Sequence, residues 1–233
     1  MVVSLSIIRY KKRYIPFALL AMAVHRLPLA FTKPCTFWKL LGCGKNGTFT
    51  LKPDLQQWAL LTVWQTQQDC DRFYQSSFIA GWWRFFGCEL WTITCEPLSS
   101  HGKWNGKNPF TGTDAPANYN GPVVVLTRAT IRPSKVKHFW KNVGAVADIM
   151  SDASGYIASF SIGEAPFFLQ ATFSIWKDAA SMKAFAYQSR QHSEVIRKTR
   201  EDKWYSEELF ARFIPLKTSG TINGKNPFYK VES

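Results

Sequence analysis

The stretch Asn105-Gly106-Lys107-Asn108-Pro109-Phe110 occurs a second time, residue for residue, as Asn223–Phe228. Six identical residues in a row are very unlikely to recur by chance in a chain of 233. Weaker echoes lie at nearly the same spacing: Val63-Trp64 against Ile175-Trp176, and Tyr74-Gln75-Ser76 against Tyr187-Gln188-Ser189. A repeat of about 110 residues has the size of a small domain and is too long for a solenoid unit. We therefore expect two fused copies of one fold.

The second half has the clearer pattern of elements. Val, Ile, Thr and aromatic runs bounded by turn residues predict the strands Pro122–Ile131, Gly155–Ile162, Phe167–Trp176 and Glu208–Leu216. Helical spacing predicts a helix from a Ser134 cap to about Met150, and another from an Asp178 cap to about Arg190, followed by a helical insert at His192–Lys203. The order β-α-β-β-α-β is that of the ferredoxin-like motif.

The first half repeats this order. We expect strands at Val2–Arg9, Thr36–Leu41, Trp58–Trp64 and Leu90–Leu98, with a buried helix at Tyr14–His25 and a second helix at Gln67–Phe78. The predicted fold class is α+β, with two tandem ferredoxin-like repeats that form a pseudo-dimer resembling a dimeric α/β barrel. The expected domains are residues 1–98 and 122–233. The Gly- and Pro-rich residues 99–121 form the linker and include the first copy of the motif.

In such a barrel we expect a deep apolar space between the two sheets, where haem or a hydrophobic substrate fits. The Asn, Gly and Pro of the repeated motif suit a turn, so we interpret both copies as structural clasps rather than as carriers of chemistry.

Composition and charge limit the classes of partner. The chain carries 10 Trp, 18 Phe and 8 Tyr, which suit a packed core and also suit a site for a large apolar or planar ligand. The net charge of +13 favours an anionic partner, such as a membrane surface or an acidic protein. No zinc-finger or RNA-recognition spacing occurs, so we expect no nucleic-acid partner.

The expected location is cytoplasmic. The five cysteines are odd in number and form no Cys-x-x-Cys pair, which is typical of a reduced compartment. The apolar run Ile15–Val24 lacks a convincing cleavage site and has ten residues, too few to cross a bilayer. We therefore expect no signal peptide and no transmembrane span.

One histidine stands out by its context. On a helix, His192, Ile196 and Arg200 share one face, with Arg197 beside it. An axial imidazole needs an apolar neighbour for the porphyrin plane and cations for its propionates. The same pattern is also typical of a solvated histidine on a basic helix. We interpret His25, at the end of an apolar helix, as a charge that offsets the helix dipole.

Further matches run along most of the chain. They are Leu5-Ser6-Ile7, Phe37-Trp38-Lys39-Leu40, Phe49-Thr50, Ala171–Ser174, Met182–Tyr187, His192 with Ile196-Arg197, and above all the run Trp204–Phe213. With these stretches the sequence resembles the spheroidene monooxygenase family, the acyclic carotenoid 2-ketolases.

The resemblance implies a dioxygen-dependent oxygenase acting at carbon 2 of an acyclic carotenoid end group, where two hydroxylations and loss of water give a ketone. It implies haem b as the cofactor, reduced ferredoxin as the electron donor, and peripheral contact with the membrane that holds the substrate. It makes His192 the iron ligand and Arg197 and Arg200 the propionate partners. It also assigns Trp204 and Tyr205 to the cofactor site, and Arg26 and Lys39 to the catalytic site.

Two alternatives remain open at this point. A carrier of carotenoid with the same fold and no metal would share the aromatic richness and would consume no oxygen. Charge-driven binding to nucleic acid is a weaker alternative, and it would show a steep dependence on salt.

Overall fold

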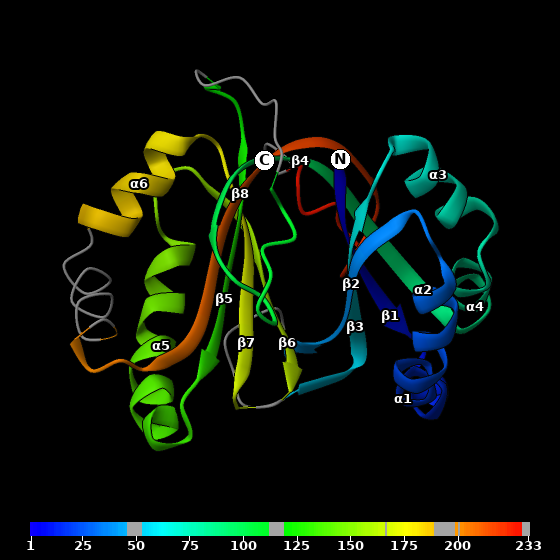
Figure 1. Cartoon of the computed structure of the whole chain (residues 1–233), viewed down its shortest axis with the longest axis horizontal. Helices are drawn as coiled ribbons and strands as arrows, with labels where there is room; N and C mark the ends of the chain where they lie inside the picture. The colour runs from blue at the N-terminus through cyan, green and yellow to red at the C-terminus, as the bar shows by residue number, and fades with distance from the viewer. Residues whose placement is uncertain (46–52, 112–118, 166, 189–198, 200, 230–233) are drawn as a thin grey trace.

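The structure is a computed structural model that describes residues 1–45, 53–111, 119–165, 167–188, 199 and 201–229. Within these ranges, eight antiparallel strands close into one barrel, in the order β1-β3-β2-β6-β7-β5-β8-β4 (Figure 1). The strands are β1 (Val2–Tyr10), β2 (Cys35–Gly44), β3 (Pro53–Trp64), β4 (Gly87–Gly102), β5 (Val123–Ile131), β6 (Tyr156–Ala165), β7 (Leu169–Trp176) and β8 (Tyr205–Gly220). The chain is thus an α+β protein, as predicted.

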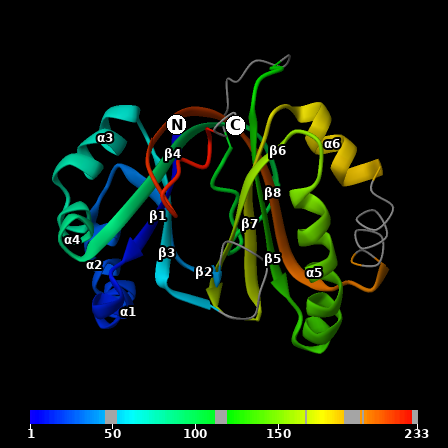
Figure 2. The ribbon, with the colours of Figure 1, turned by 180° about the vertical axis from the view of Figure 1, so that it is seen from behind.

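The helices cover the outside of the barrel on two opposite sides (Figures 1 and 2). On the side of β1–β4 lie α1 (Ile15–Val24), α2 (Arg26–Phe31), α3 (Gln67–Ser76) and α4 (Phe78–Phe86). On the side of β5–β8 lie α5 (Val136–Ser151) and α6 (Ala179–Gln188). Short 3-10 turns, Lys12–Tyr14 and Pro133–Lys135, precede α1 and α5.

The strand order is the same in the two halves of the chain. In the first half the neighbours run β4-β1-β3-β2, and in the second half they run β8-β5-β7-β6. Long pairing of β4 with β8 joins the halves along one seam, from Trp91 with Gly220 to Gly102 with Leu209. The other seam is a short contact of β2 with β6 near Cys43 and Ile162.

Side chains fill the interior of the barrel. Because alternate residues of a strand face opposite sides, every second residue of each strand points inward. These residues form one continuous apolar core from both halves, including Ile7, Leu61, Trp91, Leu126 and Phe173. The expectation of a deep space between the sheets is therefore wrong. The two hollows described below lie outside the barrel, one between α5 and α6 and the other between the sheet and α1.

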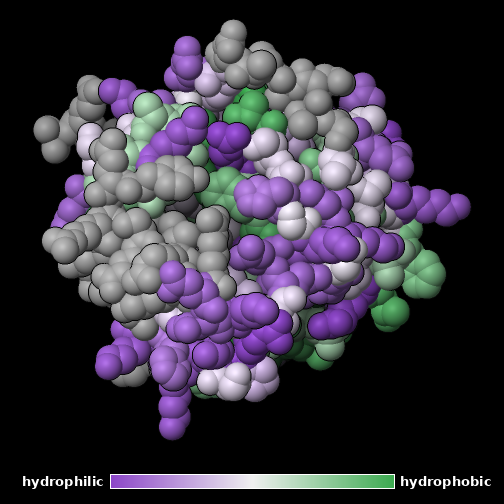
Figure 3. Space-filling view, turned by 60° about the vertical axis from the view of Figure 1, so that its left-hand side comes forward, coloured by the Kyte–Doolittle hydropathy of each residue, from purple (hydrophilic) through white to green (hydrophobic). Residues whose placement is uncertain are grey.

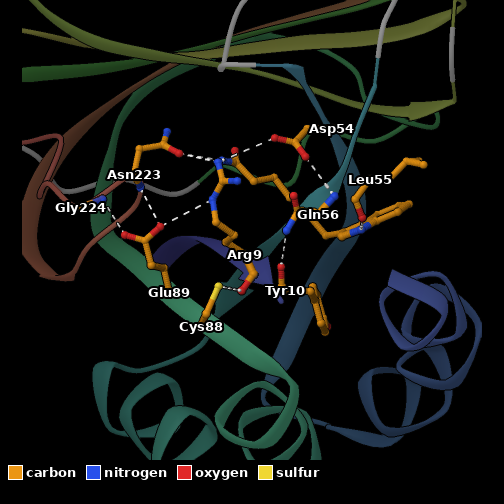
Figure 4. A network of polar contacts seen from close by, with 11 residues as sticks. Arg9, Tyr10, Asp54, Leu55, Gln56, Cys88, Glu89, Asn223 and Gly224 are labelled. Carbon is orange, nitrogen blue, oxygen red and sulfur yellow. Dashed lines mark hydrogen bonds and ion pairs between the residues drawn. The ribbon is translucent and has the colours of Figure 1, made fainter. Parts of the chain in front are cut away.

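Both copies of the repeated motif act as clasps across the two halves. Asn105 and Asn223 have φ of 55° and 56°, and each begins a turn whose N–H groups donate to one carboxylate. The Asn223 and Gly224 N–H groups donate to Glu89 of the first half, at 2.9 and 2.6 Å. Arg9 lies beside Glu89, and its guanidinium also contacts Asp54 and donates to Asn223 (Figure 4).

The first copy of the motif binds the second half of the chain. The Asn105 and Gly106 N–H groups donate to Glu207 of the second half, at 2.9 and 2.7 Å. Arg128 is the cation beside Glu207. Each motif thus reaches across the seam and binds a glutamate of the other half, which agrees with their interpretation as clasps.

The helices of the first half differ most from prediction. The helix expected at Tyr14–His25 continues through α2, so that Lys12–Phe31 is a helical segment of 20 residues, long and apolar enough to cross a membrane by length and composition alone. The expectation that this helix is buried is wrong, since only 22% of its most apolar window is buried. The sequence pattern also missed α4. In the second half, Lys135 and not Ser134 occupies the N-cap of α5, because the Pro133–Lys135 turn comes first.

Candidate functional site

An open hollow of about 660 Å³ lies between α5 and α6, outside the second half of the barrel. Its lining is mostly small or apolar, with Asp152 and two serines as the polar exceptions: Ile149, Asp152, Ala153, Ser154, Ala180, Ser181, Ala184 and Phe185. In Figure 3, which brings this side forward, most described side chains are hydrophilic and a few hydrophobic ones show in the middle of the face. A volume of this size is typical of sites for cofactors and other large ligands.

Local sequence chemistry shapes the hollow. Asp178 caps α6, as predicted, by accepting a hydrogen bond of 2.7 Å from the Ser181 N–H. That bond is the largest of the contacts that hold the pKa of the Asp178 carboxyl below its usual value. Gly155, with φ of 78°, ends the turn from α5 into β6, where a Cβ would lie 2.4 Å from the Ser181 hydroxyl oxygen. Glycine is therefore required where the two walls approach each other.

Apolar packing forms the floor beneath the hollow. Met150, Trp176 and Met182 are buried there, and the rings of Trp176 and Phe185 lie 5.3 Å apart at a tilt of 32°. The site is thus suited to bind a large apolar or planar group. Its carboxylate and hydroxyl groups can orient a ligand, but none of them carries electrons.

The predicted cofactor residues fall in two places. His192, Arg197 and Arg200 lie outside the described residues, and His192 follows the last residue of α6 by four positions in the sequence. Trp204 is buried with Ile131 and Phe139 beside the start of α5, whereas the hollow lies at the end of α5. Tyr205 joins this cluster, and burial raises the pKa of its hydroxyl to about 12. The described contacts thus do not bring Trp204 and Tyr205 to the hollow.

The two predicted catalytic residues lie on opposite faces of one sheet. Arg26 is exposed on α2, outside the barrel, where its Nε donates to the Met22 carbonyl oxygen. Lys39 lies on β2 and points inward with Leu41 and Cys43. The structure therefore does not bring them together.

Lys39 belongs to a charged cluster at one end of the barrel interior. Its Nζ lies 2.5 Å from Glu164, which also accepts a hydrogen bond of 2.6 Å from the Trp104 indole N–H. Arg128, which is 2% exposed, lies 3.7 Å from Glu164 and pairs with Glu207 as well. Two cations and two carboxylates balance each other around the Trp104 ring, which both cations approach.

Hydrogen bonds and an ion pair lower the pKa of the Glu207 carboxyl. Burial acts to raise the pKa of this carboxyl, but the N–H groups of Gly106 and Asn105 and the Arg128 guanidinium together hold it below its usual value. The cluster missed by sequence reasoning did leave a signal. In Val123–Ile131 the arginine takes the inward position that follows Val124 and Leu126, which predicts a buried partner of opposite charge.

A second, much smaller cavity lies under α1, lined by His25, Tyr10 and Trp58 among others. Its volume of about 10 Å³ is at most that of one water molecule. His25 is 1% exposed, and its Nε2 has no hydrogen-bond partner in the described part of the chain. Burial lowers its pKa to about 4, so the imidazole is neutral at neutral pH. The interpretation of His25 as a charge at the helix end is therefore wrong.

The residue types that commonly bind metal ions do not cluster in the described ranges. No group of three or more His, Cys, Asp or Glu residues that could hold a metal ion occurs among them. The five cysteines are free.

Comparison with known proteins gives close relatives in sequence. No family model matches the chain. It is 37% identical over 228 residues to the spheroidene monooxygenase of Rhodobacter capsulatus, covering 97% of this chain and 95% of that protein. It is 36% identical over 229 residues to the spheroidene monooxygenase of Cereibacter sphaeroides, covering 97% and 70%. The protein of the same name from Rubrivivax gelatinosus is 36% identical over 189 residues, covering 81% and 72%.

Solved structures agree on the fold alone. The aldoxime dehydratase OxdRE in complex with butyraldoxime has a TM-score of 0.60 at 10% identity, covering 93% of this chain and 79% of that one. A second aldoxime dehydratase structure has a TM-score of 0.59 at 10% identity, covering 92% and 80%.

Proposed function

Because the chain belongs to the spheroidene monooxygenase family, we propose that it is a carotenoid monooxygenase that oxidises carbon 2 of an acyclic end group. The observation that carries this proposal is identity above a third along 97% of the chain. Each hydroxylation takes up one dioxygen, two electrons and two protons and releases one water. A second hydroxylation at the same carbon gives a gem-diol, which loses water to leave the ketone.

The hollow between α5 and α6 supports a haem site. Its volume and its small apolar lining suit a large planar group, and its walls lack redox groups of their own. His192 would ligate the iron, and Arg197 and Arg200 would pair with the propionates. When bound, haem supplies the activation of dioxygen. The residues of the chain hold the polyene against apolar walls, exclude water and fix which end of the substrate faces the cofactor.

We also propose an electron donor, a membrane contact and an origin by duplication, which the charge and the strand order of the chain support. The net charge of +13 suits reduced ferredoxin, an acidic protein, as the electron donor, and it suits peripheral contact with an anionic membrane from the cytoplasm. The recurring strand order and the reciprocal clasps support an origin as two tandem ferredoxin-like repeats.

One experiment tests the activity and another tests the cofactor. Purified protein is supplied with an acyclic carotenoid, reduced ferredoxin and ¹⁸O₂, and products are analysed by chromatography with mass detection. We expect ¹⁸O in a 2-hydroxy or 2-keto product. Stoichiometric uptake of carotenoid with no oxygen incorporated would instead identify a carrier.

For the cofactor, absorption spectra are recorded for the oxidised protein and for the protein reduced in carbon monoxide. We expect a Soret band that shifts on reduction, that is lost in His192→Ala and that is kept in His101→Ala, whose side chain is exposed on β4. A wild-type protein without this band, after expression with ample haem, would overturn the haem site and leave the family assignment standing.

A further inference from the structure

The helices over the first half of the barrel expose an unusual amount of apolar surface. Seven of the thirteen large hydrophobic side chains that are exposed in the described ranges belong to α1, α2 and α4. They are Phe17, Leu19, Leu20, Leu27, Phe31, Phe78 and Phe85, and we call the surface that they form the docking face. Phe31 is 80% exposed and Phe85 is 70% exposed, values that are costly for such side chains in water.

The sequence of α1 explains why this surface cannot be hidden by turning the helix. Ile15–Val24 has no polar side chain, so the helix is apolar around its whole circumference. A helix of this kind is normally buried on all sides. Here only Ala18 and Ala21 are buried, because the barrel covers one side and nothing in the described chain covers the other.

Aromatic contacts join α1 and α4 into one continuous surface. The Phe17 ring stacks on Phe86 with the ring centres 4.5 Å apart, and it meets the edge of Trp82 at 6.4 Å. Phe78 extends the row, with its ring centre 5.8 Å from that of Trp82. A contiguous apolar patch marks a site of interaction, whereas scattered apolar residues do not.

Basic side chains border the docking face. Six of them are exposed on or next to its helices: Lys11, Lys12, Arg13, Arg26, Lys33 and Arg84. No Asp or Glu occurs in residues 11–33 or in residues 78–86. The occupant of this face must therefore offer apolar contact and negative charge together.

An anionic lipid bilayer meets both requirements. Apolar and aromatic side chains of an interfacial helix enter the boundary between headgroups and acyl chains, while Lys and Arg pair with the headgroups. A second copy of the chain fits poorly, because a symmetric contact would bring the same basic residues of both copies together. We propose that α1, α2 and α4 lie in the surface of an anionic membrane, with the docking face immersed at the level of the headgroups. This gives the peripheral contact of the proposed function its location on the molecule.

The test uses vesicles without carotenoid, so its outcome is independent of enzymatic activity. Sedimentation with phosphatidylcholine vesicles containing phosphatidylglycerol is compared with sedimentation with pure phosphatidylcholine. We expect binding that is at least tenfold tighter to the anionic vesicles and that weakens as salt is added. The double variant Phe31→Ser/Phe85→Ser removes two exposed rings, of which Phe85 meets only the edge of the Phe86 ring at 4.8 Å, so it should fold and bind at least tenfold more weakly.

Two further variants separate the contributions. Lys11→Glu/Lys12→Glu should weaken binding to anionic vesicles by about fivefold or more for each lysine replaced, and should leave the weak binding to neutral vesicles unchanged. Leu216→Ser is the matched control, because Leu216 is an exposed apolar residue on β8, away from the docking face, and its loss should have no effect.

Three outcomes would overturn the proposal. The first is equal binding by wild type and Phe31→Ser/Phe85→Ser. The second is a dimer in solution that this double variant dissociates, which would make a second copy the occupant. The third is resistance of the bound protein to alkaline carbonate, because an interfacial protein is released and a transmembrane helix is not.

Discussion

The buried imidazole of His25 should make the stability of this protein fall steeply in mild acid. Burial lowers the pKa of His25 from 6.5 to about 4 in the folded state, where its ring meets the rings of Phe78, Trp82 and Trp83. The folded pKa is therefore below the unfolded one. Between these two values the unfolded chain binds more protons, so the free energy of unfolding decreases as the pH falls from 6.5 towards 4.

The size of this loss follows from the shift in pKa. A difference of one pKa unit corresponds to about 1.4 kcal/mol, so the shift of His25 gives a loss of roughly 3 kcal/mol by pH 4. That is a large part of the stability of an ordinary domain. The contribution of His25 to this pH dependence should not exceed about 1.4 kcal/mol per pH unit, because one proton is involved.

Urea unfolding at a series of pH values measures this loss directly. The variant His25→Phe keeps a ring of similar size, cannot be protonated and removes the unpaired Nε2. We expect it to be at least as stable as wild type at pH 7, and the advantage should grow by roughly 3 kcal/mol towards pH 4. His25→Leu should show the same growing difference from a lower starting stability. A difference between wild type and His25→Phe that stays constant from pH 7 to pH 4.5 would refute the assignment of a neutral, buried His25.

Other predictions concern the clasps and the charged cluster. Glu207→Ala should lower the free energy of unfolding by about 3–5 kcal/mol, because it leaves a fully buried arginine short of a partner. Glu89→Ala should lower the free energy of unfolding by about 1–2 kcal/mol, since its partner Arg9 is partly exposed. Equal losses for Glu207→Ala and Glu89→Ala in urea unfolding would contradict this account. Gly102→Ala should prevent normal folding, because the added Cβ would lie 2.2 Å from a backbone oxygen of β8. Gly106→Ala should lower the free energy of unfolding by only about 1–2 kcal/mol, because a Cβ there meets open space and only the φ of 77° is unfavourable. Lys39→Met should lower the melting temperature and leave turnover per folded molecule unchanged, and a folded variant without turnover would support the catalytic role predicted from the family.

Local sequence patterns predicted the order of elements well, because alternation and turn residues act within a few positions. The Asp178 cap and the strand ending at Trp176 are examples. Strand lengths were underestimated at β4 and β8, which extend to Gly102 and Gly220 because they pair with each other across the seam. Such pairing depends on tertiary context, which no local window contains.

The helix α4 was missed for a related reason. Its sequence, Phe78–Phe86, is rich in aromatic residues that favour strands, and it contains Gly81. A Ser77 cap, whose hydroxyl accepts from the Ala80 N–H at 3.1 Å, starts the helix nevertheless. The partner of Arg128 could not be predicted for a different reason, since Arg128 and Glu207 are 79 positions apart and only the closed barrel brings them together.

The proposed haem site and the proposed membrane contact use different parts of the molecule. A filled barrel stands between the docking face on α1, α2 and α4 and the hollow between α5 and α6, which lie on opposite sides (Figures 1 and 2). In a membrane-bound molecule the proposed haem site would therefore face the aqueous side, where the proposed electron donor could reach it. Because the two sides are separate, losing the docking face should impair delivery of substrate and not its oxidation. We expect Phe31→Ser/Phe85→Ser to reduce turnover of carotenoid supplied in anionic vesicles and to leave turnover of detergent-dispersed carotenoid within about twofold of wild type, a difference well under 1.4 kcal/mol. Equal loss in both assays would place the docking face in the active site and contradict the division between the two sides.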